Sequence, residues 1–370
     1  MVVVATLLAL VTILAAPAER HLRAASLLLG LSGAEPSWSS LVTSDFSVES
    51  VEVPAEVTST KAPSIRARVY RPIGNLMPSR GLVLAHGVHW LGIDEPRLIA
   101  LARAFARSGV TVLTPELGPL ADYRIDDEGN LDALRVSVRW LARDPGVRSG
   151  GVGLLGVSFA GGLSLRVASE PALAADLAYV ASIGGHHDMA RVAKYFVTDR
   201  IDTVHGEMAW KAHDYGLAVL VYNEPERFVS KDDAPHLRAA VRAYLRETYP
   251  AAESAALAMS PEGREVFDRI AHRDRMALTA TVLRELPSMT ETMRAASPVG
   301  RMNQIHVPVF LLHGAHDDVV PPSESEFSAA EVTGEVHLLI TSKIGHAELG
   351  KDDNHFDEIR LVRFMAGLLD

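Results

Sequence analysis

A serine in a glycine-rich turn is the residue of this 370-residue chain whose surroundings first suggest chemistry. Ser158 stands in the run GVSFAGG, after the apolar segment 151–155 and before a helical pattern that extends to about residue 169. A sharp strand-to-helix turn needs small residues two positions on either side of the serine, because the backbone folds back on itself there. Such a turn raises the hydroxyl above the edge of a sheet and aims the Phe159 N–H at a developing oxyanion. The alternative is an ordinary turn in which the serine caps the helix.

Two acids and a histidine follow later apolar segments. Asp317 and Asp318 come shortly after the segment 307–312, and His346 comes after 336–340. A carboxylate just past a strand end can hold the tautomer of a histidine on the next loop, and that histidine can take the proton of a serine. Taken singly, either acid could instead stabilise its own loop, and one of 15 histidines near a strand end means little.

The loop after the apolar segment 82–85 is placed to supply a second oxyanion donor. His86, Gly87 and Val88 follow that segment directly, and the glycine lets the chain bend over the strand end. The Val88 N–H would then emerge beside the Ser158 turn. We interpret His86 as a buried structural histidine, and His89 and Trp90 as residues that line a substrate pocket.

The elements that must position these residues follow a strand–helix alternation. Segments 48–53 and 65–69 alternate apolar and polar residues, which predicts an antiparallel pair at the start of the sheet. Continuous apolar segments then predict strands at 82–85, 110–113, 151–155, 177–183, 307–312 and 336–340, and helical periodicity between them predicts helices at 97–107, 131–142, 159–169, 323–330 and 356–369. The pattern indicates an α/β fold with a mostly parallel, doubly wound sheet of about eight strands. The carboxyl ends of its parallel strands share one edge, where the motifs meet.

With its motifs in the order Ser158, Asp317, His346, the chain resembles the α/β-hydrolase superfamily of serine hydrolases, of the esterase or lipase kind with a large helical lid. The resemblance extends from residue 48 to the C-terminus and is clearest over 307–321, where Asp317 matches the family acid better than Asp318. One departure is Ala160, where the family usually has glycine.

The resemblance implies a mechanism for these residues. His346 would remove the proton of Ser158 as it attacks an acyl carbonyl, and Asp317 would steady the imidazolium. The N–H groups of Val88 and Phe159 would stabilise the oxyanion, and the chemistry needs no cofactor and no metal. The resemblance thus implies a serine hydrolase that cleaves carboxylic acyl esters of small molecules.

A long insertion, residues 188–296, interrupts the alternation and is mostly helical in pattern, most clearly at 234–247, 261–273 and 275–286. We interpret it as a helical lid between the two parts of a catalytic domain, 45–187 and 297–370, with residues 32–44 as a linker. His187 is a further pocket candidate. A metal site at His186 and His187 is disfavoured, because adjacent side chains in an extended strand point to opposite faces.

Residues 1–18 contain no charged side chain, and a second apolar stretch follows at 24–31. This length is near the lower limit for a spanning helix, but it also suits a cleaved signal or a helix packed on the domain. Residues 1–31 are therefore predicted to be an anchor or a signal. The protein would be attached to a membrane through residues 1–18 or exported, with a cytoplasmic location as the alternative.

Composition excludes several classes of function. The chain has 46 acidic and 36 basic residues, a net charge of −10, which argues against nucleic acid as a partner. It has no cysteine, which excludes disulfides, thiolate zinc sites and a cysteine nucleophile. An amidase or peptidase and a thioesterase remain alternatives on the same three residues. A non-catalytic, membrane-tethered binding protein on a hydrolase fold is an alternative of another class.

Overall fold

The computed structural model describes residues 2–34, 36–54, 64–74, 77–125, 127–346 and 355–370, without the side chains of residues 2–16, 275 and 355. Its main sheet has eight strands in the order β1–β2–β4–β3–β5–β6–β9–β10. The strands are β1 Phe46–Pro54, β2 Ser64–Pro72, β3 Arg80–Ala85, β4 Val110–Pro115, β5 Val152–Val157, β6 Leu177–Ile183, β9 Val309–Gly314 and β10 Val336–Thr341. Strand β2 is antiparallel to β1 and β4, and the other pairs are parallel. The predicted mostly parallel α/β sheet is confirmed.

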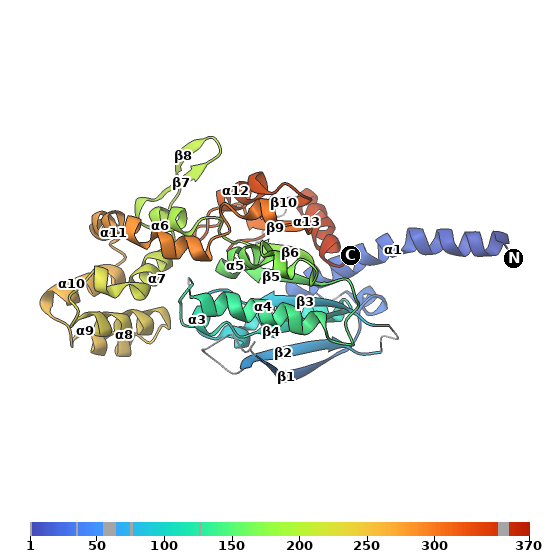
Figure 1. Cartoon of the computed structure of the whole chain (residues 1–370), viewed down its shortest axis with the longest axis horizontal. Helices are drawn as coiled ribbons and strands as arrows, with labels where there is room; N and C mark the ends of the chain where they lie inside the picture. The colour runs from blue at the N-terminus through green and yellow to red at the C-terminus, as the bar shows by residue number, and fades with distance from the viewer. Residues whose placement is uncertain (1, 35, 55–63, 75–76, 126, 347–354) are drawn as a thin grey trace.

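Helices cover both faces of this sheet (Figure 1). The flanking helices are α2 Pro96–Arg107, α3 Gly118–Ala121, α4 Glu128–Ala142, α5 Phe159–Ala168, α12 Ser323–Glu331 and α13 His355–Leu368, and short 3₁₀ turns lie at Ser37–Leu41, Gly92–Asp94, Pro171–Leu173, Pro225–Arg227 and Met302–Gln304. In β3, Leu82 and Leu84 pack with α2 and α13, whereas Val83 and Ala85 pack with α4 and α5. A strand buried on both faces needs an apolar residue at every position, which explains the continuous apolar segments in the sequence.

Helix α2 illustrates how local sequence sets these elements. Leu98, Ala102 and Phe105 recur at helical spacing and are all buried against the sheet. The helix begins after Glu95, whose carboxylate accepts a hydrogen bond of 2.8 Å from the Leu98 N–H, and Pro96 occupies the first helical position. This capping arrangement satisfies an amide that has no partner within the helix.

The insertion leaves the sheet after β6 and returns before β9, as the sequence predicts. It contains α6 Met189–Thr198, β7 Arg200–Thr203, β8 Gly206–Ala209, α7 Tyr215–Asn223, α8 Ala234–Leu245, α9 Tyr249–Ala256, α10 Pro261–Ala271 and α11 Arg275–Ala296. The β7–β8 hairpin is absent from the prediction because its short strands are mostly exposed and carry no alternating pattern. Helix α11 runs through Pro287, beyond the predicted end at 286, because the buried Met289 and Met293 hold its second half against the body.

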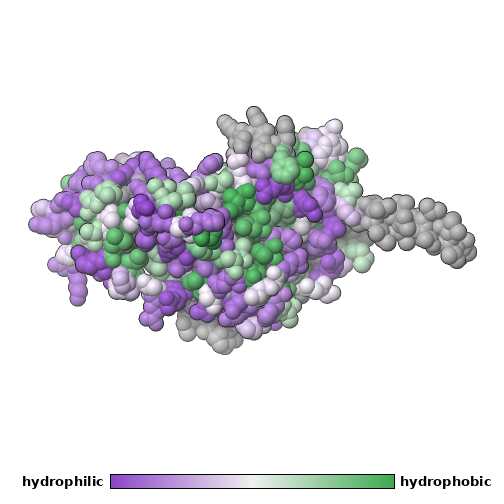
Figure 2. Space-filling view, turned by 90° about the horizontal axis from the view of Figure 1, so that it is seen from above, coloured by the Kyte–Doolittle hydropathy of each residue, from purple (hydrophilic) through white to green (hydrophobic). Residues whose placement is uncertain are grey.

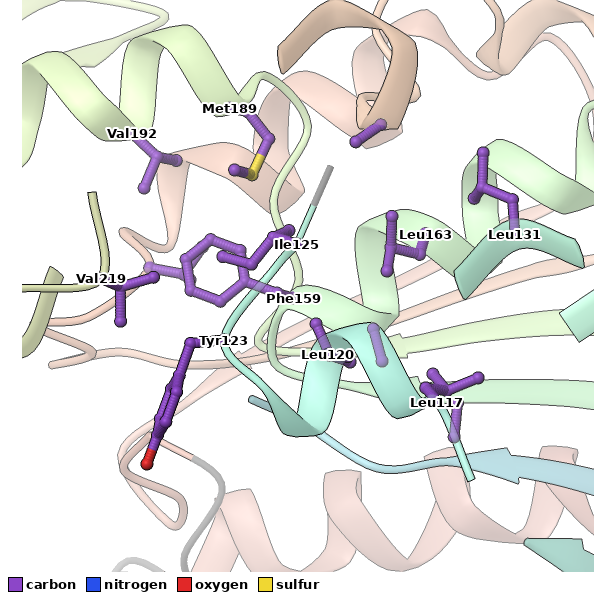
Figure 3. Close-up of a cluster of buried hydrophobic side chains, with 14 of the residues drawn as sticks. Leu117, Leu120, Tyr123, Ile125, Leu131, Phe159, Leu163, Met189, Val192 and Val219 are labelled. Atoms are coloured by element: carbon purple, nitrogen blue, oxygen red, sulfur yellow. The ribbon is translucent and has the colours of Figure 1, made fainter. Parts of the chain in front are cut away.

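The hydrophobic core beneath the insertion is continuous with the core of the sheet. Phe159, at the start of α5, lies between Tyr123 and Ile125 of the body and Met189 and Val219 of the insertion (Figure 3). On the face seen in Figure 2, hydrophobic residues gather over the middle of the molecule, whereas the surface of the insertion, at the left, is largely polar. The insertion therefore packs on the sheet through the residue that follows Ser158.

The first helix, α1 Val2–Leu31, packs on α2 and α13. Its Ala24 and Leu27 are fully or almost fully buried there, so the apolar stretch from residue 24 packs on the body. In the segment predicted to be a linker, residues 37–41 form a 3₁₀ turn and the Ser44 N–H bonds to the Arg107 carbonyl. The boundaries at 31 and 44 stay predictions.

The predicted membrane segment falls on residues 1–18, most of whose side chains lie outside the described part of the structure. Among the residues that are described, no helix combines the length and apolar character needed to cross a membrane.

Candidate active site

Ser158 occupies the predicted sharp turn between β5 and α5. Its backbone lies at φ 56° and ψ −136°, a region that non-glycine residues rarely adopt. The turn is held by a hydrogen bond of 2.7 Å from the Ser158 N–H to the Ile183 carbonyl. A Cβ at Gly156 would lie 2.1 Å from the Ala160 carbonyl oxygen, so only glycine fits there. The strand-to-helix turn is therefore built from short-range steric requirements that the sequence displays.

The glycine pair after the turn brings α5 against the end of β6. A Cβ at Gly161 would lie 2.3 Å from the Ser182 Oγ, and one at Gly162 would lie 2.3 Å from the His186 ring. Ala160, the departure from the family pattern, is fully buried, and its methyl group is accommodated in the core.

The structure brings Ser158, His346 and Asp317 together over the carboxyl ends of the strands. The Ser158 Oγ lies 2.9 Å from the His346 Nε2, and the His346 Nδ1 lies 2.7 Å from the Asp317 Oδ2. With the Nδ1–H donated to the carboxylate, Nε2 is left to accept the serine proton. Asp318, the alternative acid, instead lines the pocket beside these residues.

The carboxylate of Asp317 is deeply buried and fully engaged. Its Oδ1 accepts hydrogen bonds of 2.9 Å from the N–H groups of Val319 and Val320, and the His313 Nε2 lies 3.5 Å from its Oδ2. Burial on its own would raise the pKa of Asp317, but hydrogen bonds from His313 and His346 outweigh it and hold the pKa well below its usual range. Asp317 is therefore an anion suited to stabilise an imidazolium.

The 86–88 loop approaches the serine closely, since a Cβ at Gly87 would lie 3.2 Å from the Ser158 Cβ. Within the described residues, the N–H groups of Val88 and Phe159 donate no hydrogen bond to the protein, and both residues line the pocket. Their role as oxyanion donors stays a prediction. The His86 Nδ1 donates to the Gly87 carbonyl and its Nε2 accepts from the Leu117 N–H, while burial lowers the pKa of the ring, so His86 is a neutral structural bridge.

A pocket of about 420 Å³ opens beside the serine. Its walls come from the 86–89 loop, from Leu98 and Leu101 of α2, and from His213 and Tyr215 of the insertion. The sequence prediction does not include the last two. They lie in no motif, and the aromatic content of the insertion is the only signal that points toward them.

Two of the three predicted pocket residues lie elsewhere. His89 lines the pocket, but Trp90 is 46% exposed outside it and stacks on the His89 ring at 6.0 Å. His187 turns toward α12, where its Nε2 lies 2.7 Å from the Glu331 Oε2. The buried Glu324 holds this turn by accepting hydrogen bonds from the His187 N–H and from Arg191. Long-range partners in α6 and α12 set the direction of His187, whereas the Trp90 side chain is exposed beside its neighbour His89.

The adjacent histidines at the end of β6 have separate partners. The His186 Nε2 donates to the Ala296 carbonyl at 3.2 Å, away from the His187 ring. Among the described residues, no group of three or more histidine, aspartate and glutamate side chains is arranged to hold a metal ion.

Burial of His186 predicts a loss of stability in mild acid. Burial lowers the pKa of the folded-state ring to about 4, below its ordinary value of 6.5. Between these values the unfolded chain binds more protons, so the free energy of unfolding falls as the pH drops from 6.5 toward 4. The lost stability from this group between pH 7 and pH 4.5 should be about 2 kcal/mol.

Urea unfolding of His186→Gln at these two pH values tests this prediction. Glutamine keeps an N–H donor for the Ala296 carbonyl but does not titrate. The variant should lose less stability than the wild type on acidification. The control His205→Gln, at an exposed position, should behave as the wild type. An unchanged acid sensitivity of His186→Gln would show that another group causes it.

Comparisons with known proteins agree with this geometry at the level of family. The family model described as X-Pro dipeptidyl-peptidase (S15 family) matches residues 122–347, more than half of the chain. No curated protein matches the chain.

Several solved structures are similar at low identity. The acylaminoacyl peptidase of Pyrococcus horikoshii has a TM-score of 0.49 and 13% identity, over 88% of this chain and 41% of that one, so the present chain spans less than half of its length. The 2,6-dihydroxy-pseudo-oxynicotine hydrolase has a TM-score of 0.47 and 16% identity, over 87% of this chain and 68% of that one. The Pyrococcus furiosus esterase Pf2001 has a TM-score of 0.47 and 12% identity, with coverage of 88% and 94%.

The segment matched by the family model includes Ser158, Asp317 and His346, which the α/β-hydrolase order of strands brings to one sheet edge. The chain is a serine hydrolase of the α/β-hydrolase fold and belongs to the X-Pro dipeptidyl-peptidase (S15) family.

Proposed function

We propose that this protein hydrolyses carboxylic esters of small molecules through an acyl-enzyme on Ser158. The observation that carries the proposal is the unbroken hydrogen-bond path from the Ser158 Oγ through the His346 ring to the Asp317 carboxylate, at the wall of a pocket. A nucleophile, a base and a group that orients the base are the parts that acyl transfer requires.

In the proposed first half-reaction, the Ser158 Oγ attacks the ester carbonyl carbon while the His346 Nε2 takes the serine proton. Asp317 stabilises the imidazolium, and the N–H groups of Val88 and Phe159 stabilise the oxyanion. The tetrahedral intermediate then expels the alcohol, which takes the proton from His346. Water, deprotonated by His346, attacks the acyl-enzyme, and the acid leaves as Ser158 regains its proton.

The pocket supports a small substrate. Its volume of about 420 Å³ lies toward the lower end of the range for small-molecule sites. Leu98 and Leu101 offer an apolar wall for an acyl or alkyl group, and His213 and Asp318 offer polar groups on the side of the insertion.

Removal of dipeptides from peptide N-termini is a second candidate function, and two observations favour it. The family match carries that activity in its name, and Asp318, an exposed acidic residue, lines the same pocket as His346. A carboxylate in this position is suited to pair with the ammonium group of a free N-terminus.

A panel of chromogenic substrates separates these functions. It contains p-nitrophenyl acetate, butyrate and octanoate, an acyl thioester, Ala-Pro-p-nitroanilide and its N-acetylated form. We expect kcat/KM for the best ester to exceed that for the anilides by about 100-fold or more. If Ala-Pro-p-nitroanilide is cleaved as well as the esters and acetylation of its amine abolishes cleavage, the peptidase replaces the esterase. Ser158→Ala serves as the blank for every substrate.

A further inference from the structure

Side chains of the insertion donate hydrogen bonds to the main chain of the acid loop, the loop that carries Asp317 and Asp318. The Trp210 indole Nε1–H donates a hydrogen bond of 3.0 Å to the carbonyl of Asp317. The Tyr195 hydroxyl lies 2.8 Å from the carbonyl of Asp318 and 3.0 Å from that of Lys211, and it shares its one proton between them. The Asp318 carbonyl also accepts the His213 N–H at 2.7 Å. The carbonyls of Asp317 and Asp318 therefore accept hydrogen bonds from residues that are more than a hundred positions away in sequence.

The insertion holds the opposite side of the site as well. The Tyr215 hydroxyl donates a hydrogen bond of 3.2 Å to the carbonyl of Val88, in the loop proposed to supply an oxyanion donor. Burial raises the pKa of Tyr215 well above its ordinary value, so the hydroxyl stays protonated and able to donate. In the same core, Phe159 lies beside Met189, Val192 and Val219 of the insertion (Figure 3).

We propose that Trp210, Tyr195 and Tyr215 are positioning residues, which hold the acid loop and the 86–88 loop in register with Ser158. The insertion is thus part of the frame of the catalytic site, in addition to covering the pocket. This inference rests on the proposed function, because it presupposes that Asp317 and Val88 act on the reacting serine.

These contacts matter because the reaction tolerates little displacement of its catalytic groups. The Asp317 carboxylate is tied to its own backbone by a single methylene, so any shift of that backbone moves the Oδ2 away from the His346 Nδ1. A misplacement of about 1 Å in a catalytic group can lower the rate by about 100-fold. A carbonyl that loses its donor is freed to rotate toward water, which permits such a shift.

Three conservative variants test this proposal: Trp210→Phe, Tyr195→Phe and Tyr215→Phe. Each removes one donor and keeps an aromatic ring. Tyr222→Phe is the matched control, because the Tyr222 hydroxyl also joins the insertion to the body, donating 2.8 Å to the Asp122 Oδ2, but touches neither catalytic loop. The main readout is the rate constant for labelling by a fluorophosphonate probe, since labelling does not depend on the natural substrate. Values of kcat and KM on the best ester and the thermal midpoint complete the set.

We expect Trp210→Phe to lower the labelling rate and kcat by about 10-fold, with KM within about twofold of the wild type, because it removes the donor to the Asp317 carbonyl. Tyr195→Phe should have a smaller effect in the same direction, because the Asp318 carbonyl keeps the hydrogen bond from the His213 N–H. Tyr215→Phe should also have a smaller effect in that direction. Tyr222→Phe should label as fast as the wild type even if its thermal midpoint falls. If Trp210→Phe does not fold, the two tyrosine variants decide, because they change no ring.

The inference would be overturned if Tyr195→Phe, and those of Trp210→Phe and Tyr215→Phe that fold, were labelled at the wild-type rate. The contacts of the insertion with the two loops would then have a structural role alone. Failure of the proposed function looks different: the wild type itself would not be labelled, or Ser158→Ala would be labelled equally well.

Discussion

Replacement of Ser158 by alanine is expected to abolish both ester hydrolysis and labelling by a fluorophosphonate. Loss of the nucleophile in a serine hydrolase lowers kcat by about 10⁶-fold, because His346 and Asp317 are left to activate only water. The substitution removes one oxygen from a residue that is 6% exposed and leaves the turn intact. The measurement is the labelled fraction after exhaustive reaction, together with kcat on the best ester of the substrate panel.

Ser164→Ala provides the matched control for this experiment. Ser164 is fully buried six residues further along the same helix, α5, and does not line the pocket. Its alanine variant should be labelled to completion at the wild-type rate. Complete labelling of Ser158→Ala at the wild-type rate would place the label on another residue and remove Ser158 as the nucleophile, and with it the proposed mechanism.

Asp317→Asn is expected to lower kcat by about 10⁴-fold while the protein remains folded. The side-chain oxygen of asparagine can still accept the N–H groups of Val319 and Val320, so the loop keeps its shape. Its amide nitrogen then faces the His346 Nδ1 and donates to it, which places the imidazole proton on Nε2. In that tautomer His346 cannot accept the proton of Ser158.

Asp318→Asn separates the two adjacent acids. The Asp318 side chain lies at the pocket wall, outside the path from Ser158 to Asp317, so its loss should change kcat by less than about 10-fold and act mainly on KM. Steady-state kinetics of the two variants with one ester give the comparison. Equal losses of kcat would contradict the assignment of Asp317 as the acid. If dipeptide release is the function, Asp318→Asn should instead raise KM strongly for substrates with a free amine and not for blocked ones.

The elements that build this site could be predicted because their signals are local. Central strands such as β3 and β5 are buried on both faces over residues 81–85 and 152–156, so these segments contain no polar side chain and are visible in the sequence itself. The turn at Ser158 requires a glycine two positions earlier, where a Cβ would clash with the Ala160 carbonyl. The choice of Asp317 over Asp318 comes from the resemblance to the family, because both acids follow β9.

The pocket and its supports could not be predicted in the same way. Trp90 and His187 stand beside the right motifs, yet one side chain points outward and the other is drawn to Glu331 across the fold. Pro287 suggests the end of a helix, but packing of Met293 continues it. The outcomes for His187 and for α11 depend on tertiary contacts, which no local pattern displays.

Local patterns were enough to predict the sheet and the turn at Ser158, because backbone sterics and hydrophobic periodicity act over a few neighbouring residues, and the order of Ser158, Asp317 and His346 supplied the rest through the family resemblance. The role of the insertion in holding those residues became visible with the three-dimensional contacts. Trp210, Tyr195 and Tyr215 donate their hydrogen bonds to main-chain carbonyls. Every residue has such a carbonyl, so the residue types of the acid loop and the 86–88 loop give no sign of these hydrogen bonds.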